Sequence, residues 1–221
     1  MDIALLELTL RVAILATLIN LPIAIIVAWL VVRKKVWGSL FIDIAVSLPL
    51  AVPPVVVGFL LLLLLGREGL VGKIVDRVLG TDIVFTWIAA VLASAIVSFP
   101  LIARATMVAM GAVDERYEMC ARTLGAGSVR VFLTITVPLA YRGVLAGVLL
   151  GFVRALSEFG ATITVAGNIP GKTQTLPLAI YSSVQIRDDD MAIKLAIISV
   201  VLAVFTLIIH NWLLARGQAK R

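Results

Sequence analysis

The chain has 221 residues, of which 62% are hydrophobic and 14% are charged, and its mean hydropathy is +1.12. A soluble domain has about 45–50% apolar and about 25% charged residues, so we expect a polytopic membrane protein and not a soluble enzyme. The net charge of +6 comes from bases spread along the chain, which argues against nucleic-acid binding. The single cysteine excludes an internal disulfide and a multi-cysteine metal site.

Five segments are apolar and long enough to cross a membrane as α-helices: residues 12–32, 44–65, 83–110, 143–167 and 192–214. The first is not a signal peptide, because its start, MDIALLE, is acidic and no small-residue cleavage site follows. The apolar stretch 131–141 is short and contains Pro138, so we expect it to re-enter the interface without crossing. We therefore predict one all-α transmembrane domain over residues 1–221.

The placement of lysine and arginine predicts the orientation of these spans. The clusters VVRKK and ARGQAKR directly follow the first and fifth spans, and basic residues favour the cytoplasmic side. Five spans with the N-terminus outside place both clusters inside, together with the C-terminus and residues 111–130.

Prolines interrupt the second span at Pro49, Pro53 and Pro54. Each proline removes a backbone donor, and the freed carbonyl groups need partners within protein or in a cavity. The second span is therefore either a gate or hinge element or a plain kinked helix.

The charged segment Asp114–Arg130 interrupts two apolar regions and still has a helical pattern. Asp114 is a good N-cap, and Gly125 is suited to the position after a helix end. One apolar face is formed at spacings i, i+3, i+4 and i+7 by Tyr117, Cys120, Ala121 and Leu124. Such a helix either rests on the membrane surface or docks on a partner protein.

The fourth span carries two ionisable residues at spacing i, i+4, Arg154 and Glu158, about 16 Å from its cytoplasmic start. Charged residues at such depth usually face a cavity or a partner. The pair either fixes helix packing or lines a pathway. In the same span, Gly143, Gly147 and Gly151 form a ridge of small residues that lets another helix approach.

The charged segment resembles the cytoplasmic signature of ABC-importer permeases, which reads E-A-A, three residues, G, nine residues, I-x-L-P. Met119-Cys120-Ala121 stand where the signature has E-A-A, and Glu118 lies one place earlier. Gly125 and Ile135 match, and Val137-Pro138 stand for L-P.

The resemblance extends over essentially the whole chain and is closest to molybdate-importer permeases. It is carried by the segments SLPLAVPPVVVGFLLL, SFPLIARA, ARTLGAGSVRVFLTITVPL and RALSEFGATITVAGNIPGKTQTLPLAIY. It implies a type I ABC-importer permease in the cytoplasmic membrane, which works by alternating access and is surrounded by lipid.

The resemblance also implies partners. These are a second copy of the chain, two copies of an ATPase subunit inside, and a molybdate-binding protein outside. The chain contains no G-x-x-x-x-G-K-[ST] motif, so ATP and Mg²⁺ would bind the ATPase subunit. We expect no cofactor, no metal site and no catalytic residue in this chain.

Residues 111–130 then form the coupling loop that docks on the ATPase. The expected coupling residues are Asp114, Glu118, Met119, Cys120, Ala121, Arg122, Gly125, Ile135 and Pro138. The candidate pathway or gate residues are Arg154, Glu158, Pro53, Pro54 and Ser98.

Two alternatives stay open. The same architecture could carry tungstate, sulfate or another oxyanion. A self-contained secondary transporter or channel would need internal repeats or broken-helix ion sites, and the sequence shows no repeat.

Overall fold

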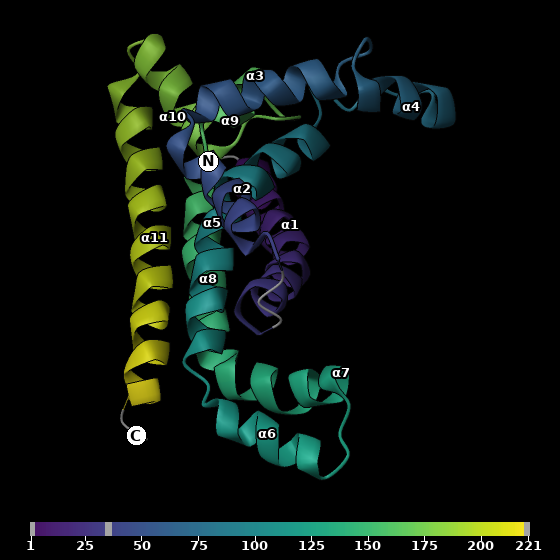
Figure 1. The fold of residues 1–221 in the computed structure, drawn as a ribbon. Coiled ribbons are helices and arrows are strands. Elements are labelled where there is room, and N and C mark those ends of the chain that lie inside the picture. Colours follow the sequence, from purple (N-terminus) through teal and green to yellow (C-terminus); the bar gives the residue numbers. More distant parts are fainter. Residues whose placement is uncertain (1–2, 34–36, 219–221) are drawn as a thin grey trace.

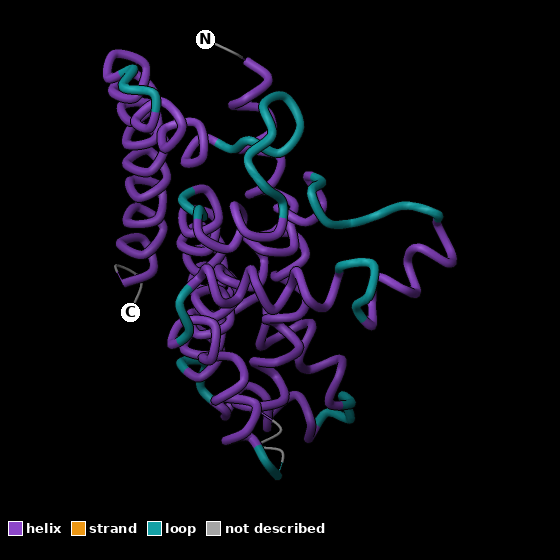
Figure 2. Tube along the Cα trace, turned by 90° about the horizontal axis from the view of Figure 1, so that it is seen from above, coloured by secondary structure: helices purple, strands orange, loops and turns teal. Residues whose placement is uncertain are grey.

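The computed structural model describes residues 3–33 and 37–218, and the regular structure within these ranges is helical (Figures 1 and 2). In chain order the α-helices are α1 (Ile3–Ala28), α2 (Ser39–Ala51), α3 (Pro54–Leu65), α4 (Leu70–Leu79), α5 (Trp87–Gly111), α6 (Glu115–Thr123), α7 (Ser128–Val131), α8 (Val137–Leu156), α9 (Gly160–Val165), α10 (Leu176–Gln185) and α11 (Asp189–Gln218). Two π-helical turns, η1 (Trp29–Arg33) and η2 (Phe132–Thr136), extend α1 and join α7 to α8.

Four continuous helical segments of the described chain are long and apolar enough to span a membrane: Ile3–Arg33, Trp87–Gly111, Ser128–Leu156 and Asp189–Ala215. The pair α2 and α3 adds a fifth if it counts as one span, but the two helices are bent by 110°. The apolar helices predicted from the sequence are therefore present, although several bounds differ.

The second span is broken, where the sequence predicted one helix over 44–65. Val52 and Pro53 both precede a proline, and their ψ angles are 135° and 136°. A residue before proline is pushed out of the helical region, so two in succession end α2. Pro54 then begins α3, because the first turn of a helix needs no backbone donor.

The fourth span is displaced from its predicted position at 143–167. The helix begins at Ser128 and ends at Leu156, so the stretch 131–141 is part of the span and is not a separate re-entry. Residues 128–130 of the predicted coupling loop likewise belong to this helix. The π turn η2 widens the helix just before Pro138, whose ring would otherwise clash with a carbonyl one turn earlier, so the helix passes this proline.

Close packing of α1, α5 and α8 forms the core. A Cβ atom built on Gly143 would lie 2.5 Å from Cβ of Ala109, and one on Gly147 would lie 2.6 Å from Cβ of Ala105. The predicted glycine ridge of α8 is thus confirmed as the surface on which α5 packs. Asn20 of α1 donates to the Ala95 carbonyl of α5 at 2.8 Å.

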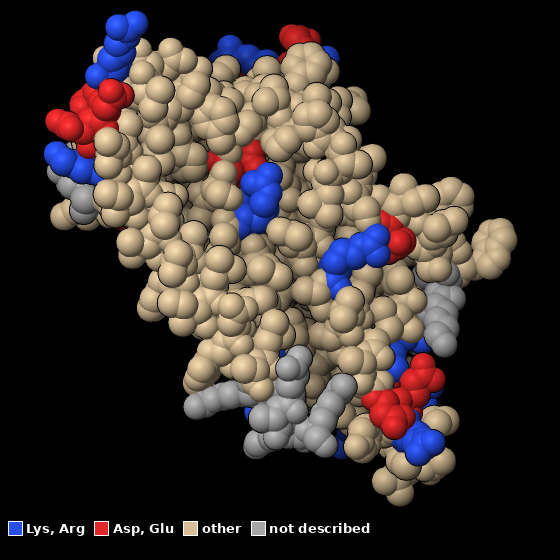
Figure 3. Space-filling view, turned by 90° about the vertical axis from the view of Figure 1, so that its left-hand side faces the viewer, with Lys and Arg blue, Asp and Glu red and all other residues tan. Residues whose placement is uncertain are grey.

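The outside of the molecule is apolar. Helix α11 packs on α8 and α10, and most of its surface remains exposed (Figure 1). Figure 3 shows a face that is mostly free of charge, with charged side chains in a few small groups. Such a surface suits lipid contact.

The functional segments lie at opposite ends of the bundle. Figure 1 places α6 and α7 at one end, with the C-terminal part of α11, and places α3, α4, α9 and α10 at the other. Helix α4 projects from the second end on a loop whose base is closed by Arg67 and Asp82, 2.8 Å apart. The guanidinium beside it lowers the pKa of the Asp82 carboxyl.

Candidate functional site

The segment between α5 and α8 folds as its turn residues predict. Asp114 is the N-cap of α6 and accepts a hydrogen bond from the Arg116 backbone N–H at 2.9 Å. Gly125 follows the C-cap with φ +85°, and the next residue, Ala126, donates its N–H to the Ala121 carbonyl at 3.1 Å. This left-handed turn with its backward bond is a Schellman motif, which favours glycine at that position.

Helix α6 presents an apolar face that the described chain does not cover. Leu124 is 89% exposed and Tyr117 is 59% exposed, and Cys120 is exposed on the same side of the helix. We call these three residues the docking face. Met119 is also exposed, but it lies two residues from Tyr117 and points to another side of α6. Ala121 is half-buried at the edge of the docking face. A cluster of large apolar side chains at the polar end of a membrane protein is typical of a protein interface.

Glu118 does not lie on the docking face, although the sequence grouped it with the coupling residues. It is 6% exposed and points into its own chain. One carboxylate oxygen accepts a hydrogen bond from the Thr136 hydroxyl at 2.7 Å and lies 3.0 Å from Nε of Arg33. Arg122, half-exposed, lies 3.5 Å from the other oxygen.

The remaining signature residues lie where the chain enters the fourth span. Ile135 is half-buried in η2, and Pro138 is exposed in the first turn of α8. Arg33 was not predicted as part of this site, because in the sequence it is only a basic residue at the end of a span. Thr136 was not predicted either, because it lies within an apolar stretch.

The second candidate site is the junction between α8 and α9. The Arg154 guanidinium lies 2.8 Å from Oε2 of Glu158, and Glu158 is 2% exposed. The two residues are not on one helix, as the spacing suggested, because α8 ends at Leu156. Oε1 of Glu158 instead accepts the Ala161 N–H at 2.8 Å and caps the start of α9.

Helix α9 packs directly beneath the broken span. A Cβ atom built on Gly58 of α3 would lie 2.6 Å from the Ala161 carbonyl oxygen, and one on Gly160 would lie 3.1 Å from Cβ of Pro54. The bend at Pro53 and Pro54 and the pair Arg154–Glu158 thus meet at the same end of the bundle, through α3 and α9.

Ser98 lies elsewhere, between α1 and α5. It is fully buried, donates to the Ser94 carbonyl at 2.6 Å and accepts from Asn20 at 3.1 Å. These contacts hold two helices together, and the residue lines no open surface in this conformation.

A further ion pair joins α2 to α5. The Arg104 guanidinium lies 2.7 Å from Oδ1 of Asp43 and donates to the Ser47 hydroxyl oxygen at 2.5 Å. This pair could not be predicted from the sequence, because its members are 61 residues apart. Arg104 remains 45% exposed in the described chain, and such a charge is unfavourable against lipid.

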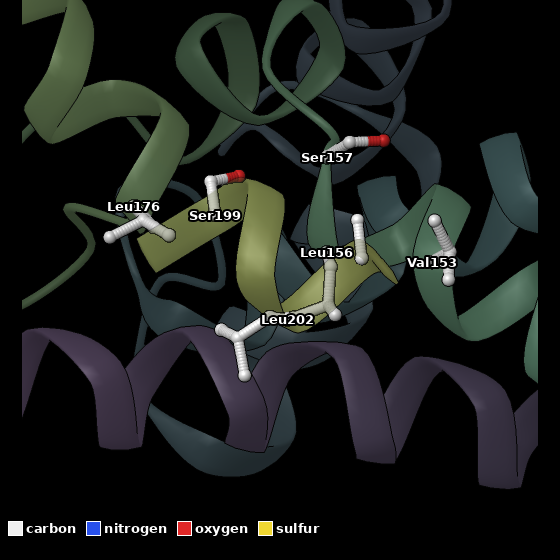
Figure 4. Close-up of a pocket in the computed structure, with 7 residues that line it drawn as sticks. Val153, Leu156, Ser157, Leu176, Ser199 and Leu202 are labelled. Carbon is white, nitrogen blue, oxygen red and sulfur yellow. The ribbon is translucent and has the colours of Figure 1, made fainter. Parts of the chain in front are cut away.

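Two of the cavities of the described chain lie beside α11. One of about 30 Å³ lies between α8 and α11, beside Val153, Leu156 and Leu202 (Figure 4), and holds little more than a water molecule. Another of about 250 Å³ lies between the first turns of α1, the loop before α10, and α10 and α11. Neither is lined by a charged side chain.

Comparison with known proteins identifies related chains. The family model described as "Binding-protein-dependent transport system inner membrane component" matches residues 20–217. The molybdenum transport system permease protein ModB of Haemophilus influenzae is 46% identical over all of this chain and 96% of its own length. ModB of Escherichia coli strain K12 is 47% identical over 97% of this chain and 95% of its own length.

A sulfate permease is less similar. The probable sulfate transport system permease protein cysT of Chlorella vulgaris is 33% identical over 92% of this chain and 76% of its own length. Among solved structures, a chain of the MetNI methionine ABC transporter in an inward-facing conformation has a TM-score of 0.71 at 13% identity, covering 97% of this chain and 93% of that one. A chain of a bacterial alginate ABC transporter, in complex with its alginate-bound periplasmic protein, has a TM-score of 0.73 at 18% identity. This match covers 97% of this chain and 78% of that one. These structures share the fold.

Proposed function

Because the chain belongs to the family of binding-protein-dependent transport system inner membrane components, we propose that it is the permease subunit of an ATP-driven importer of molybdate. The observation that carries this proposal is the similarity to molybdenum permeases at 46–47% identity over nearly the whole chain. It exceeds the 33% identity to the sulfate permease, so sulfate is not the favoured cargo. The protein is a multi-pass component of the cytoplasmic membrane.

The orientation follows from the basic residues and the position of α6. We propose that α2 and α3 count as one bent span, which gives five spans with the N-terminus outside and the C-terminus inside. Arg33 then ends the first span on the cytoplasmic side, as the positive-inside rule expects. The end of the bundle that holds α6 and α7 is the cytoplasmic end.

The docking face of α6 is the proposed contact with the ATPase subunit. Its exposed apolar residues, Tyr117 and Leu124, fit a groove on a partner protein better than water. The partner would bind ATP and Mg²⁺, and closure of two ATPase subunits would move α6. Met119 puts an exposed thioether on α6 where the family signature has a carboxylate.

The proposed translocation path lies between two copies of the chain. Neither of the two cavities described above offers a charged side chain to a tetrahedral dianion. Arg104 and Arg154 keep part of their surface exposed, although each is paired with a carboxylate. A paired arginine attracts an anion only weakly, which suits a path that must release its cargo.

The outer gate is proposed at the contact of α3 with α9. There the second span breaks at two prolines and turns by 110°, and α3 packs on the short helix capped by Glu158. Two short helices joined to the neighbouring helices by non-helical residues can shift without unfolding those neighbours.

The test is reconstitution with purified partners. The permease is placed in liposomes with the ATPase subunit and the binding protein of a molybdate importer, and uptake of radioactive molybdate is measured. We expect uptake that requires ATP and the binding protein and that excess sulfate does not inhibit. Equal competition by tungstate would broaden the cargo to both oxyanions. Uptake by the permease alone, driven by an ion gradient, would contradict the proposal and support a secondary transporter.

A further inference from the structure

We infer that Arg33, Glu118 and Thr136 form a latch that transmits the movement of α6 to α1 and α8. This inference rests on the proposed function, because it assigns a role within ATP-driven transport. It concerns the face of α6 opposite to the docking face, which receives no role in the proposal above.

Glu118 is the centre of the latch. Its carboxylate accepts the Thr136 hydroxyl at 2.7 Å and pairs with Arg33 at 3.0 Å, and its side chain is 8% exposed. An ion pair in water exchanges its partners readily, whereas a shielded carboxylate held by one hydroxyl donor and one guanidinium cation keeps them in one geometry. One side chain of α6 is thereby joined to the ends of two membrane spans.

Arg33 adds a connection to the third span. Its side chain is 5% exposed, and one terminal nitrogen donates to the backbone carbonyls of Met110 and Val113 at 2.7 and 2.6 Å. These carbonyls belong to the end of α5 and the residues that lead into α6. A single guanidinium therefore joins α1, the end of α5 and Glu118.

The latch is built on the two π-helical turns of the described chain. Arg33 is the last residue of η1, and Thr136 is the last residue of η2. Their first residues, Trp29 and Phe132, also meet, with ring centroids 5.1 Å apart. A π turn carries an extra residue and changes the direction of the side chains that follow, and such turns occur often at functional sites. The two turns thus contact each other through rings at one end and through Glu118 at the other.

The contacts on the two faces of α6 separate two tasks. Tyr117 and Leu124 are exposed for a partner, whereas Glu118 is buried against the spans. When the partner moves α6, Arg33 and Thr136 follow because their contacts with Glu118, an ion pair and a hydrogen bond, are shielded from solvent. The latch is a set of positioning residues that convert this movement into a rotation or shift of α1 and α8.

The experiment compares two threonines of the same helix in the reconstituted complex. Thr136→Val removes the hydroxyl that reaches Glu118 and keeps the shape of the side chain. Thr134→Val makes the same change at an exposed residue whose hydroxyl bonds the Arg130 carbonyl of its own helix, and serves as the control. For each variant we measure molybdate uptake, ATP hydrolysis and the amount of ATPase subunit that copurifies.

We expect Thr136→Val to keep the ATPase subunit and to hydrolyse ATP, while the molybdate transported per ATP falls at least fivefold. Thr134→Val should keep the wild-type ratio. Arg33→Gln, which removes the connection to α1, should lower the ratio further at an equal amount of assembled complex.

Two results would overturn the latch. An unchanged ratio in Thr136→Val and Arg33→Gln would show that α6 moves the spans without these bonds. Loss of the ATPase subunit from Thr136→Val would assign the residue to docking instead. Failure of the proposed function would give a different result, because the wild-type complex itself would then take up no molybdate with ATP.

Discussion

Gly125 shows how backbone conformation alone can favour one residue type at a turn. Its φ is +85°, and a Cβ atom built on it meets nothing within 4 Å. The space around it is open, so a larger side chain would be excluded only by the left-handed backbone. For a residue with a Cβ atom that conformation costs about 1–2 kcal/mol, and more for a β-branched one.

We predict that Gly125→Val weakens docking of the ATPase subunit by about tenfold, because about 1.4 kcal/mol of strain in the docked turn corresponds to that factor. Binding of the detergent-solubilised permease to immobilised ATPase measures it. Gly127→Val is the control for bulk, since Gly127 is also open but has φ −67°. Gly80→Val is the control for strain, since Gly80 has φ +62° at the other end of the molecule. Wild-type affinity of Gly125→Val would contradict a role of this turn in docking.

At the scale of elements, the junction between α8 and α9 combines two tasks in one side chain. Glu158 neutralises Arg154 and also caps α9 through the Ala161 N–H. Helix α9 is short, and its position under α3 depends on where it begins. The pair is therefore both a packing device and a part of the proposed gate, so the two readings of the sequence are compatible.

We predict that Glu158→Gln lowers the free energy of unfolding by about 2–4 kcal/mol, because it leaves Arg154 without its charge partner. The amide oxygen can still accept from Ala161, so the complex should assemble. The unpaired guanidinium should hold a dianion longer, so the maximal uptake rate should fall more than assembly does. Uptake kinetics per assembled complex and a thermal unfolding midpoint separate the two effects. Glu7→Gln, the same change at an exposed carboxylate of α1, is the control and should alter neither the uptake kinetics nor the unfolding midpoint. If Glu158→Gln has the uptake kinetics of the wild type, the pair serves packing only.

At the scale of the whole molecule, the bent pair α2 and α3 decides the topology. Counted as one span, it gives an odd number of crossings and places the N-terminus opposite to α6. Counted as a re-entrant loop, it gives an even number and places the N-terminus on the same side as the C-terminus. Figure 1 shows α3 at the end of the bundle opposite to α6, which favours a full crossing.

We predict that Cys120, the only cysteine of the sequence, reacts with a membrane-impermeant maleimide in inverted vesicles and not in intact spheroplasts. It is exposed on the docking face, so no substitution is needed to reach it. A Cys120→Ser, Lys73→Cys variant should show the opposite pattern, because exposed Lys73 lies on α4 at the other end. Labelling of both positions from one side would refute the five-span orientation. Added ATPase subunit should protect Cys120.

The sequence by itself determined the features that depend on neighbours along the chain. The apolar segments predicted a bundle of membrane helices, and the prolines of the second span indicated a hinge or a kink because each proline removes a backbone donor. Asp114 and Gly125 predicted the two ends of α6, since caps are local. The glycines of α8 predicted a close helix contact because small residues permit it.

The tertiary structure alone decided which side chains meet across the bundle. The sequence placed Glu118 among the docking residues, but the rotation of α6 turns it toward Arg33 and Thr136. It left Arg104 without a partner, but the packing of α2 on α5 brings Asp43 to it. Spacing along a helix fixes which residues share a face, whereas the direction of that face depends on all the helices that pack around it. For a buried charge, that direction determines whether it binds a partner protein or its own chain.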